Sequence, residues 1–415
     1  MRESVGVDPV VTISATDGEL ADGRGEHTRI DLCIARTIAE VEAIRDVWAR
    51  WKTHRDSDID YCLGFVWARQ TFIRPHVIVI SRDGRPDAIL VGRVERARMD
   101  SKIGYFRIPE SPIRLLCVSY RGLLGNGSAE NCELFLQSIM ESLKRGEADA
   151  SMLHYALVDS PIYKKALSVP GFAVRDHRPE TLPHHALELP TDIDQVYRGL
   201  SLGLRGQLRR QQKRIEEEFA GSIEVHCFRD QSGLDYMMSQ SEAVAKQTYQ
   251  RGLGVGFQDS SETRQRLRLC AEKGWLRAYL LRLRGKPCAF FIGTLYEGVY
   301  CGDYTGYISE LADYSLGSYL LMSAIRELCN DGVKTFDFGP GRAEYKERFG
   351  NRVWVESCIY VFAPGLKGFF LNGIRTSTGF FNDTLTRLLD GVNLLPKIKK
   401  LWRNVLRASH TEPSS

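Results

Sequence analysis

The chain has 415 residues, of which 43% are hydrophobic and 26% are charged, and its formal net charge is +4. This length suggests two domains, and the composition is ordinary for a soluble globular protein. So small a charge gives no whole-protein argument for nucleic-acid binding. The ten cysteines have no CxxC spacing, which argues against a zinc or redox motif and favours reduced thiols. We therefore expect a cytoplasmic protein without a metal site.

The first 27 residues contain acidic side chains and no long apolar run, so we expect a flexible tail and not a signal peptide. No stretch approaches the roughly 20 apolar residues that span a bilayer. Further along, the sequence predicts a domain over residues 28–190, a second over residues 191–363 and a helical extension over residues 364–415. The sequence predicts a basic amphipathic helix over residues 394–407, which would contact either an anionic membrane or the protein itself.

Two distant passages of the chain share one pattern. Residues 77–95 and residues 278–296 each contain an apolar strand, a polar turn with the order Gly-basic-Pro, and a second apolar strand. Each reads as a β-hairpin, and Gly92 of the first corresponds to Gly293 of the second. An amphipathic helix and a short strand follow in both halves. The shared order predicts a tandem duplication of one α/β unit.

A basic helix is predicted between the two halves, over residues 192–218. No acidic residue lies between Asp194 and Glu216. Two interpretations are open: a solvated helix face, or a surface for an anionic ligand such as the phosphates of a carrier or a sugar nucleotide. The basic residues are Arg198, Arg205, Arg209, Arg210, Lys213 and Arg214.

The segment richest in reactive side chains is TFDFGPGRAEYKERFG, residues 335–350. It predicts a short strand, a turn that uses the conformational freedom of Gly339 and Gly341, and a polar helix start. Within the strand, we expect Asp337 to pair with Lys346 or with Arg342 and to position the turn.

Three residues of this helix start are candidates for catalysis. Glu344 is a possible base, Tyr345 a proton donor, and Lys346 a group that stabilises an oxyanion or a phosphate. The alternative is an exposed helix turn held by a Glu344–Arg348 ion pair.

Two further places carry candidate chemistry. Asp303 follows a predicted strand and is either a general base or a carboxylate that caps a nearby N–H. Ser315, Gly317 and Ser318 open a predicted helix, whose N-terminus is a candidate phosphate site; the alternative is a plain N-cap by Ser315. The adjacent His184 and His185 lie in a short predicted strand, point to opposite faces and make a poor metal pair.

The second half resembles a known family, on four segments taken together. These segments are LRRQQKRIEE, LRLRGKPCAFF, GDYTGYISELADYSLGSYLLMSAI and TFDFGPGRAEYKERFG. From about residue 195 to residue 350 the chain is similar to the GNAT-type acyltransferases. It is most similar to the subfamily described from bacterial cellulose and exopolysaccharide clusters. The tandem arrangement also resembles the Fem-type aminoacyltransferases of peptidoglycan synthesis.

The resemblance implies an α/β fold of two tandem GNAT-like units, each with a mixed, mainly antiparallel sheet flanked by helices, the first unit being degenerate. It implies acetyl-CoA or another acyl-CoA as co-substrate, with Ser315, Gly317, Ser318, Gly339 and Gly341 near the cofactor. The implied reaction transfers an acyl group to an amine of a small molecule or of a cell-surface polysaccharide precursor. The alternatives are a Fem-type enzyme that uses aminoacyl-tRNA, and a non-catalytic scaffold of a polysaccharide-synthesis complex.

Overall fold

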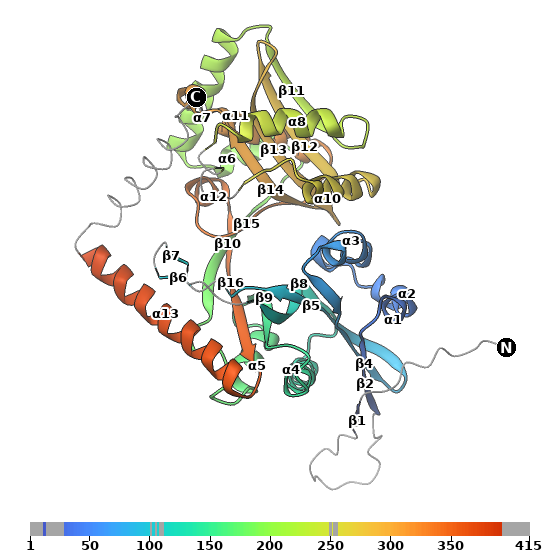
Figure 1. Cartoon of the computed structure of the whole chain (residues 1–415). Helices are drawn as coiled ribbons and strands as arrows, with labels where there is room; N and C mark the ends of the chain where they lie inside the picture. Colours follow the sequence, from blue (N-terminus) through green and yellow to red (C-terminus); the bar gives the residue numbers. More distant parts are fainter. Residues whose placement is uncertain are drawn as a thin grey trace, which may run out of the picture. The chain divides into compact units, whose positions relative to one another are not determined.

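The computed structural model describes residues 29–99, 112–248 and 256–391, together with residues 11–13, 102–103, 106–107 and 251 (Figure 1). The predicted N-terminal tail lies largely outside the described residues, as does the basic helix predicted over residues 394–407. The described chain divides into two compact units. Unit 1 extends to Thr181 and also contains Val355–Thr386, and unit 2 contains Leu182–Trp354.

Unit 1 is built on a mixed sheet with the strand order β1-β2-β4-β5-β8-β9-β16, and β3 pairs with β5. Helices α4 and α5 pack on this sheet and on each other. The strands are β1 (Val11–Ile13), β2 (Ile30–Ala35), β3 (Phe72–Pro75), β4 (Val77–Arg82), β5 (Arg85–Ala97), β8 (Ile113–Gly125), β9 (Ala150–Leu157) and β16 (Arg352–Phe362). The main helices are α1 (Ile38–Ala43), α2 (Arg45–Trp48), α3 (Ile59–Gly64), α4 (Ala129–Lys144), α5 (Pro161–Ser168) and α13 (Leu366–Gly391).

Unit 2 has a sheet with the order β10-β15-β14-β13-β12-β11, in which only β14 and β15 pair in parallel. The strands are β10 (Glu180–Glu188), β11 (Ile223–Phe228), β12 (Leu276–Leu283), β13 (Lys286–Tyr296), β14 (Val299–Tyr307) and β15 (Thr335–Pro340). The helices are α6 (Ile193–Gly199), α7 (Leu202–Glu218), α8 (Leu234–Ala245), α10 (Ser261–Glu272), η3 (Ser309–Tyr314), α11 (Leu316–Asn330) and α12 (Glu344–Phe349).

The two predicted hairpins have the same register. In unit 1, Ala88 lies opposite Ile80, and the ladder then shifts by one residue before the turn. In unit 2, Ala289 lies opposite Leu281 and the same shift follows. Each hairpin is followed by an antiparallel strand, a long helix and a parallel strand, so the predicted tandem duplication is confirmed.

The last strand of each half belongs to the other unit. Strand β10 follows α5 of unit 1 in the sequence, but its residues from His184 to Glu188 pair with β15 of unit 2. Strand β16 follows α12 of unit 2, but its residues from Glu356 to Phe362 pair with β9 of unit 1. Each unit therefore completes its sheet with a strand from the other half of the sequence.

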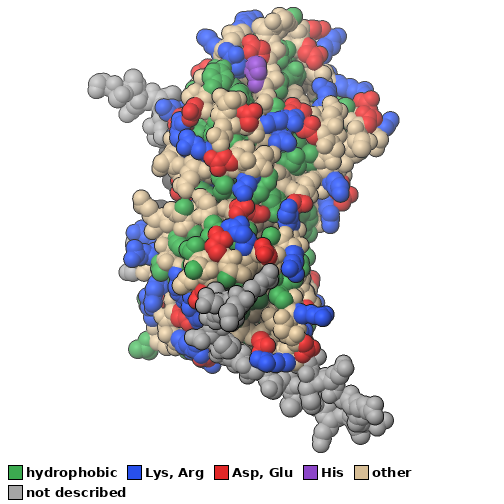
Figure 2. Space-filling view, turned by 90° about the vertical axis from the view of Figure 1, so that its right-hand side faces the viewer, with side chains coloured by type: hydrophobic (Ala, Val, Ile, Leu, Met, Phe, Trp, Pro, Cys, Tyr) green, Lys and Arg blue, Asp and Glu red, His purple; other side chains and the backbone are tan. Residues whose placement is uncertain are grey.

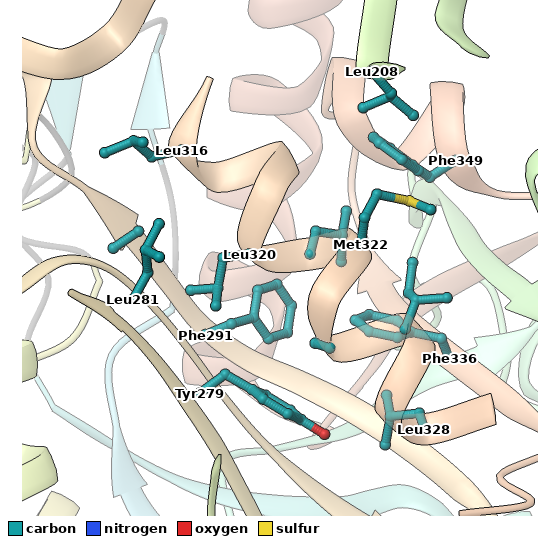
Figure 3. Packing of buried hydrophobic residues seen from close by; sticks show 14 of the residues in the cluster. Leu208, Tyr279, Leu281, Phe291, Leu316, Leu320, Met322, Leu328, Phe336 and Phe349 are labelled. Atoms are coloured by element: carbon teal, nitrogen blue, oxygen red, sulfur yellow. The ribbon is translucent and has the colours of Figure 1, made fainter. Parts of the chain in front are cut away.

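Helices cover both faces of the unit 2 sheet (Figure 1). Helices α8 and α10 pack on one face, while α7 and α11 contribute to a buried cluster on the other. In that cluster Leu208 of α7 lies close to Phe349 of α12 and Met322 of α11, while Leu320 and Phe291 pack beneath them (Figure 3). Full burial of one such side chain contributes about 1.5–3 kcal/mol to the free energy of unfolding. The packing of Leu208 therefore holds α7 against α11 and α12.

The distribution of charge and the state of the cysteines are as the sequence predicts. Basic and acidic side chains are interspersed over the face drawn in Figure 2. All ten cysteines lie in the described residues and are free thiols, most of them buried. Within the described helices, none combines the length and the apolar character that a membrane crossing requires.

Candidate functional site

The central feature of unit 2 is the place where its two parallel strands separate. Strands β14 and β15 pair from Val299 opposite Thr335 to Cys301 opposite Asp337. Within these fully described strands no further ladder pair follows, although β14 continues to Tyr307 and β15 to Pro340. Because β14 stays extended beyond Cys301, the edge that it turns toward β15 can pair with an inserted extended chain.

Helix α11 begins next to this separation, directly after β14 and η3. Ser315 precedes the helix with φ 52° and ψ 46°, a left-handed conformation that is uncommon for a residue with a side chain. Its hydroxyl makes no capping bond and instead accepts a 2.6 Å hydrogen bond from Gln211 Nε2. The plain N-cap that the sequence allowed is therefore wrong.

The missing cap leaves backbone donors open at the start of α11. The N–H groups of Ser318 and Tyr319 bond the Ser315 carbonyl. Those of Leu316 and Gly317 have no acceptor among the described residues. A Cβ at Gly317 would lie 3.2 Å from the Tyr307 ring, so this position favours glycine. Open amides at a helix N-terminus, together with the helix dipole, form a site for an anion.

The glycine turn after β15 is held by contacts within the protein. Gly339 and Gly341 have φ values of 76° and 93°, as the predicted turn requires. The Gly339 N–H donates to Asp337 Oδ1 at 2.6 Å, and the Gly341 N–H donates to the Pro183 carbonyl at 2.8 Å. These two amides are thus engaged inside unit 2, unlike those at the start of α11.

Lys346 closes the same turn. Its Nζ donates to the carbonyl oxygens of Gly339 at 3.2 Å and Pro340 at 2.9 Å. Burial lowers the pKa of this lysine, and the nearby Asp337 carboxylate opposes the shift. The structure therefore places Lys346 beneath the turn, where it fixes the direction in which the chain enters α12.

Asp337 has a partner that the sequence analysis did not identify. His184 Nε2 lies 2.5 Å from Asp337 Oδ1, and the His184 ring stacks on Trp354 with centroids 4.3 Å apart. The prediction that Asp337 pairs with Lys346 or Arg342 is therefore wrong, because its hydrogen-bond partner is His184. Because His184 lies on β10, 153 residues away, no local pattern could reveal the pair.

Asp303 lies inside β14, whereas the sequence analysis placed it after the end of the strand. It is the extra residue of a β-bulge, because Ile292 pairs with Tyr304 and the next residue of β13 pairs with Gly302. Bulges are frequent next to active sites, where they redirect a side chain. The nearly buried carboxylate lies 3.3 Å from Arg266 Nη1 of α10. Asp303 thus faces the side of the sheet that α8 and α10 cover.

Tyr345 belongs to the opposite face. Its ring packs edge-on against Phe338 at 5.9 Å and contacts the cluster that contains α11. Phe338 in turn lies 4.6 Å from Phe336. Glu344, by contrast, has a side chain that is 84% exposed and lies 3.5 Å from Arg348, which is the helix-turn pairing that the sequence left open.

The candidates are therefore distributed around one opening in the sheet, which is the place beyond Cys301 and Asp337 where β14 and β15 no longer pair. Gly317 and Ser318 lie at the start of α11, and Tyr345 lies on the same face of the sheet. Asp303 lies on the other face, with Arg266. The sequence analysis did not name Arg266, and it considered His184 only as a metal ligand, since each is recognised only by its buried carboxylate partner.

A family model described as an acetyltransferase (GNAT) domain matches residues 203–347, which are 145 of the 415 residues. This stretch runs from α7 through β14, α11 and β15 into α12, and so contains the whole opening described above. No curated protein matches the sequence.

Solved structures with a similar fold cover most of the chain. FemX aligns with a TM-score of 0.53 at 11% identity, over 80% of this chain and 98% of FemX. A tandem GNAT protein from the clavulanic acid biosynthesis pathway aligns with a TM-score of 0.48 at 11% identity, over 81% and 99% of the two chains. The C-terminal domain of a putative lysylphosphatidylglycerol synthetase from Agrobacterium fabrum gives 0.47 at 13% identity, over 81% and 95%. The chain has a fold like that of FemX, and its second unit contains the segment that matches the GNAT acetyltransferase domain model.

Proposed function

We propose that unit 2 transfers an acetyl or another acyl group from its CoA thioester to an amine of a small molecule or of a cell-surface polysaccharide precursor. The observation that carries this proposal is the separation of β14 and β15 next to the open amides of Leu316 and Gly317. The acceptor class rests on the sequence resemblance to transferases of exopolysaccharide clusters.

The residues present fit an acyl-CoA donor. The edge of β14 beyond Cys301 would pair with the amides of the pantetheine arm, in the manner of an added strand. The amides of Leu316 and Gly317 would receive the diphosphate. When bound, the thioester supplies an activated acyl carbonyl.

The two faces of the opening support different roles. On the α10 face, Asp303 accepts hydrogen bonds from the acceptor amine and orients it, while Arg266 pairs with the carboxylate and holds it in place. On the α11 face, the phenol of Tyr345 donates a proton to the leaving sulfur, and the proton that the attacking amine loses restores the phenol. Most of the rate gain at the amine comes from holding it in position against the thioester. Lys346 acts through the turn that it closes.

Tyr345→Phe tests this assignment in the full chain. We expect its kcat for thiol release from acetyl-CoA, with an amino-sugar acceptor, to fall by about 10²–10⁴. Its thermal stabilisation by acetyl-CoA should stay that of the wild type. Glu344→Gln is the matched control, since this exposed side chain should leave kcat unchanged.

Two results would count against the proposed function. Wild-type turnover in Tyr345→Phe would remove the tyrosine from the reaction. Absence of any thermal shift with acetyl-CoA or CoA would remove the donor, and a salt-sensitive titration with aminoacyl-tRNA would then test the Fem-type alternative.

A further inference from the structure

Helix α7 carries a concentration of positive charge that the proposed reaction does not use. Arg209, Arg210, Lys213 and Arg214 are exposed on it. Among them, only Lys213 has an ion-pair partner in the described residues, Glu217 at 3.6 Å, and both of those side chains are highly exposed. Arg209 with Lys213, and Arg210 with Arg214, are like-charge pairs at i, i+4, an arrangement that by itself destabilises a helix. An anion bound here would remove that repulsion.

The contacts of α7 place this charge beside the opening in the sheet. Gln211 bonds Ser315, which precedes α11, at 2.6 Å. Gln207 accepts from Arg348 Nη2 of α12 at 2.7 Å. Helix α7 therefore touches both the segment that follows β14 and the helix that follows β15. Its buried Leu208 anchors it there (Figure 3).

The four basic residues fall on two sides of the helix. At about 100° per residue, Arg214 projects roughly 60° from Gln211, which contacts Ser315, and Arg210 roughly 100°. Arg209 and Lys213 project about 160° away from Gln211. The guanidinium of Arg214 lies 4.5 Å from the centre of the Tyr314 ring, and Tyr314 directly precedes Ser315. Arg214 is thus beside the residue that precedes Ser315, Arg210 lies one turn before it on the helix, and Arg209 and Lys213 project furthest from Gln211.

We propose that Arg214 and Arg210 form a second phosphate site, which binds the 3′-phosphate on the adenosine of the CoA donor. The inference rests on the proposed function, because the diphosphate at the start of α11 would hold the adenosine end near these arginines. A phosphomonoester is the fitting ligand, since guanidinium groups bind its oxygens in a bidentate fashion. A long nucleic acid is less suited, because the helix offers only a short basic segment in a chain of net charge +4.

Calorimetric titration of the full chain with CoA and with 3′-dephospho-CoA tests the second site. We expect wild-type protein to bind CoA roughly 10- to 100-fold more tightly than dephospho-CoA. Arg214→Gln should bring CoA down to the dephospho-CoA affinity and leave dephospho-CoA binding unchanged. Arg210→Gln should have a smaller effect of the same kind. Arg209→Gln, which removes the same charge from the other side of the helix, should keep the wild-type preference.

Four other results would overturn the second phosphate site, and they differ in what they imply for the proposed function. Equal wild-type affinity for the two ligands removes the second site and leaves the proposed function intact. An equal loss in Arg209→Gln and Arg214→Gln would reduce the effect to general charge. Binding of neither ligand removes the proposed function together with the inference. Tight, salt-sensitive tRNA binding that depends on both arginines would assign α7 to nucleic acid instead.

Discussion

His76 of unit 1 is a residue that we expect to limit stability in mild acid. Its side chain is 1% exposed. Burial lowers the pKa of His76 to about 3, Arg74 acts in the same direction, and Glu147 opposes the shift. The ring nitrogens lie 3.2 Å from Arg74 Nη1 and 3.4 Å from Ser142 Oγ, which suits a neutral imidazole.

The sign of the resulting pH dependence follows from the two pKa values of His76. In the unfolded chain the imidazole titrates near 6.5, so between pH 6.5 and about 3 the unfolded state binds more protons. Stability is therefore complete above pH 6.5 and falls by about 1.4 kcal/mol per pH unit below it. Urea unfolding should show a loss of about 2 kcal/mol between pH 6.5 and pH 5. His76→Gln should flatten the profile, and an equal slope in both proteins would assign the loss to other groups.

Charged residues were the part of the site least accessible to sequence reasoning. The sequence indicated that Asp337 needs a partner, because a buried carboxylate is costly without one. It could not supply His184, since β10 crosses from the first half of the chain to reach β15. Tyr345 and Lys346 were found because the glycine turn and the helix start are adjacent in the sequence. Their different roles follow only from their contacts, because Tyr345 packs against Phe338 and Lys346 donates to the carbonyl oxygens of the turn.

At the scale of elements, the hairpin glycines allow a matched test of packing. A Cβ on Gly293 would lie 2.4 Å from the Cys301 carbonyl oxygen and 2.6 Å from the Tyr300 ring, between β13 and β14. A Cβ on Gly203 of α7 would meet nothing within 4 Å. We expect Gly293→Ala to cost about 1–3 kcal/mol, because the backbone of β14 must move. Gly203→Ala should stabilise by up to about 1 kcal/mol. Thermal melts of both variants measure the contrast, and similar melting temperatures would contradict the close approach.

Elements whose ends are set by neighbouring residues in the sequence were predicted well, and those whose ends are set by a strand far away in the sequence were not. Both hairpins follow from apolar strands around a Gly-basic-Pro turn, and Gly92 resembles Gly293 in its close contact with a neighbouring carbonyl. The predicted helix over residues 192–218 is two helices, because Ser201 starts a new one by accepting from the Leu204 N–H. Strand β15 runs to Pro340 and not to Phe338, since β10 pairs with its end through a bulge.

At the scale of the whole chain, duplication and strand exchange together explain the organisation. The parallel strands of unit 1 also stop pairing early, after Val118 opposite Leu153, although β8 continues to Gly125. Unit 1 thus repeats the opening of unit 2 but lacks the glycine turn that follows β15. The sequence analysis placed a boundary between residues 190 and 191, whereas the compact units divide after Thr181 and return to unit 1 at Val355.

The exchange predicts how the chain can be divided. A fragment of residues 191–363 lacks β10, so β15 keeps its pairing with β14 but loses its antiparallel ladder with β10, and the buried Ala186 and Leu187 are removed from the core. It also carries Glu356–Phe362, whose β9 partner is absent. A fragment of residues 182–354 keeps the β10–β15 ladder from His184 to Glu188 and omits the unpaired strand. We expect only residues 182–354 to give soluble protein with a cooperative thermal transition by circular dichroism, because an unpaired apolar strand edge aggregates. If residues 191–363 fold equally well, β10 is dispensable and the exchanged strand is not part of what stabilises unit 2.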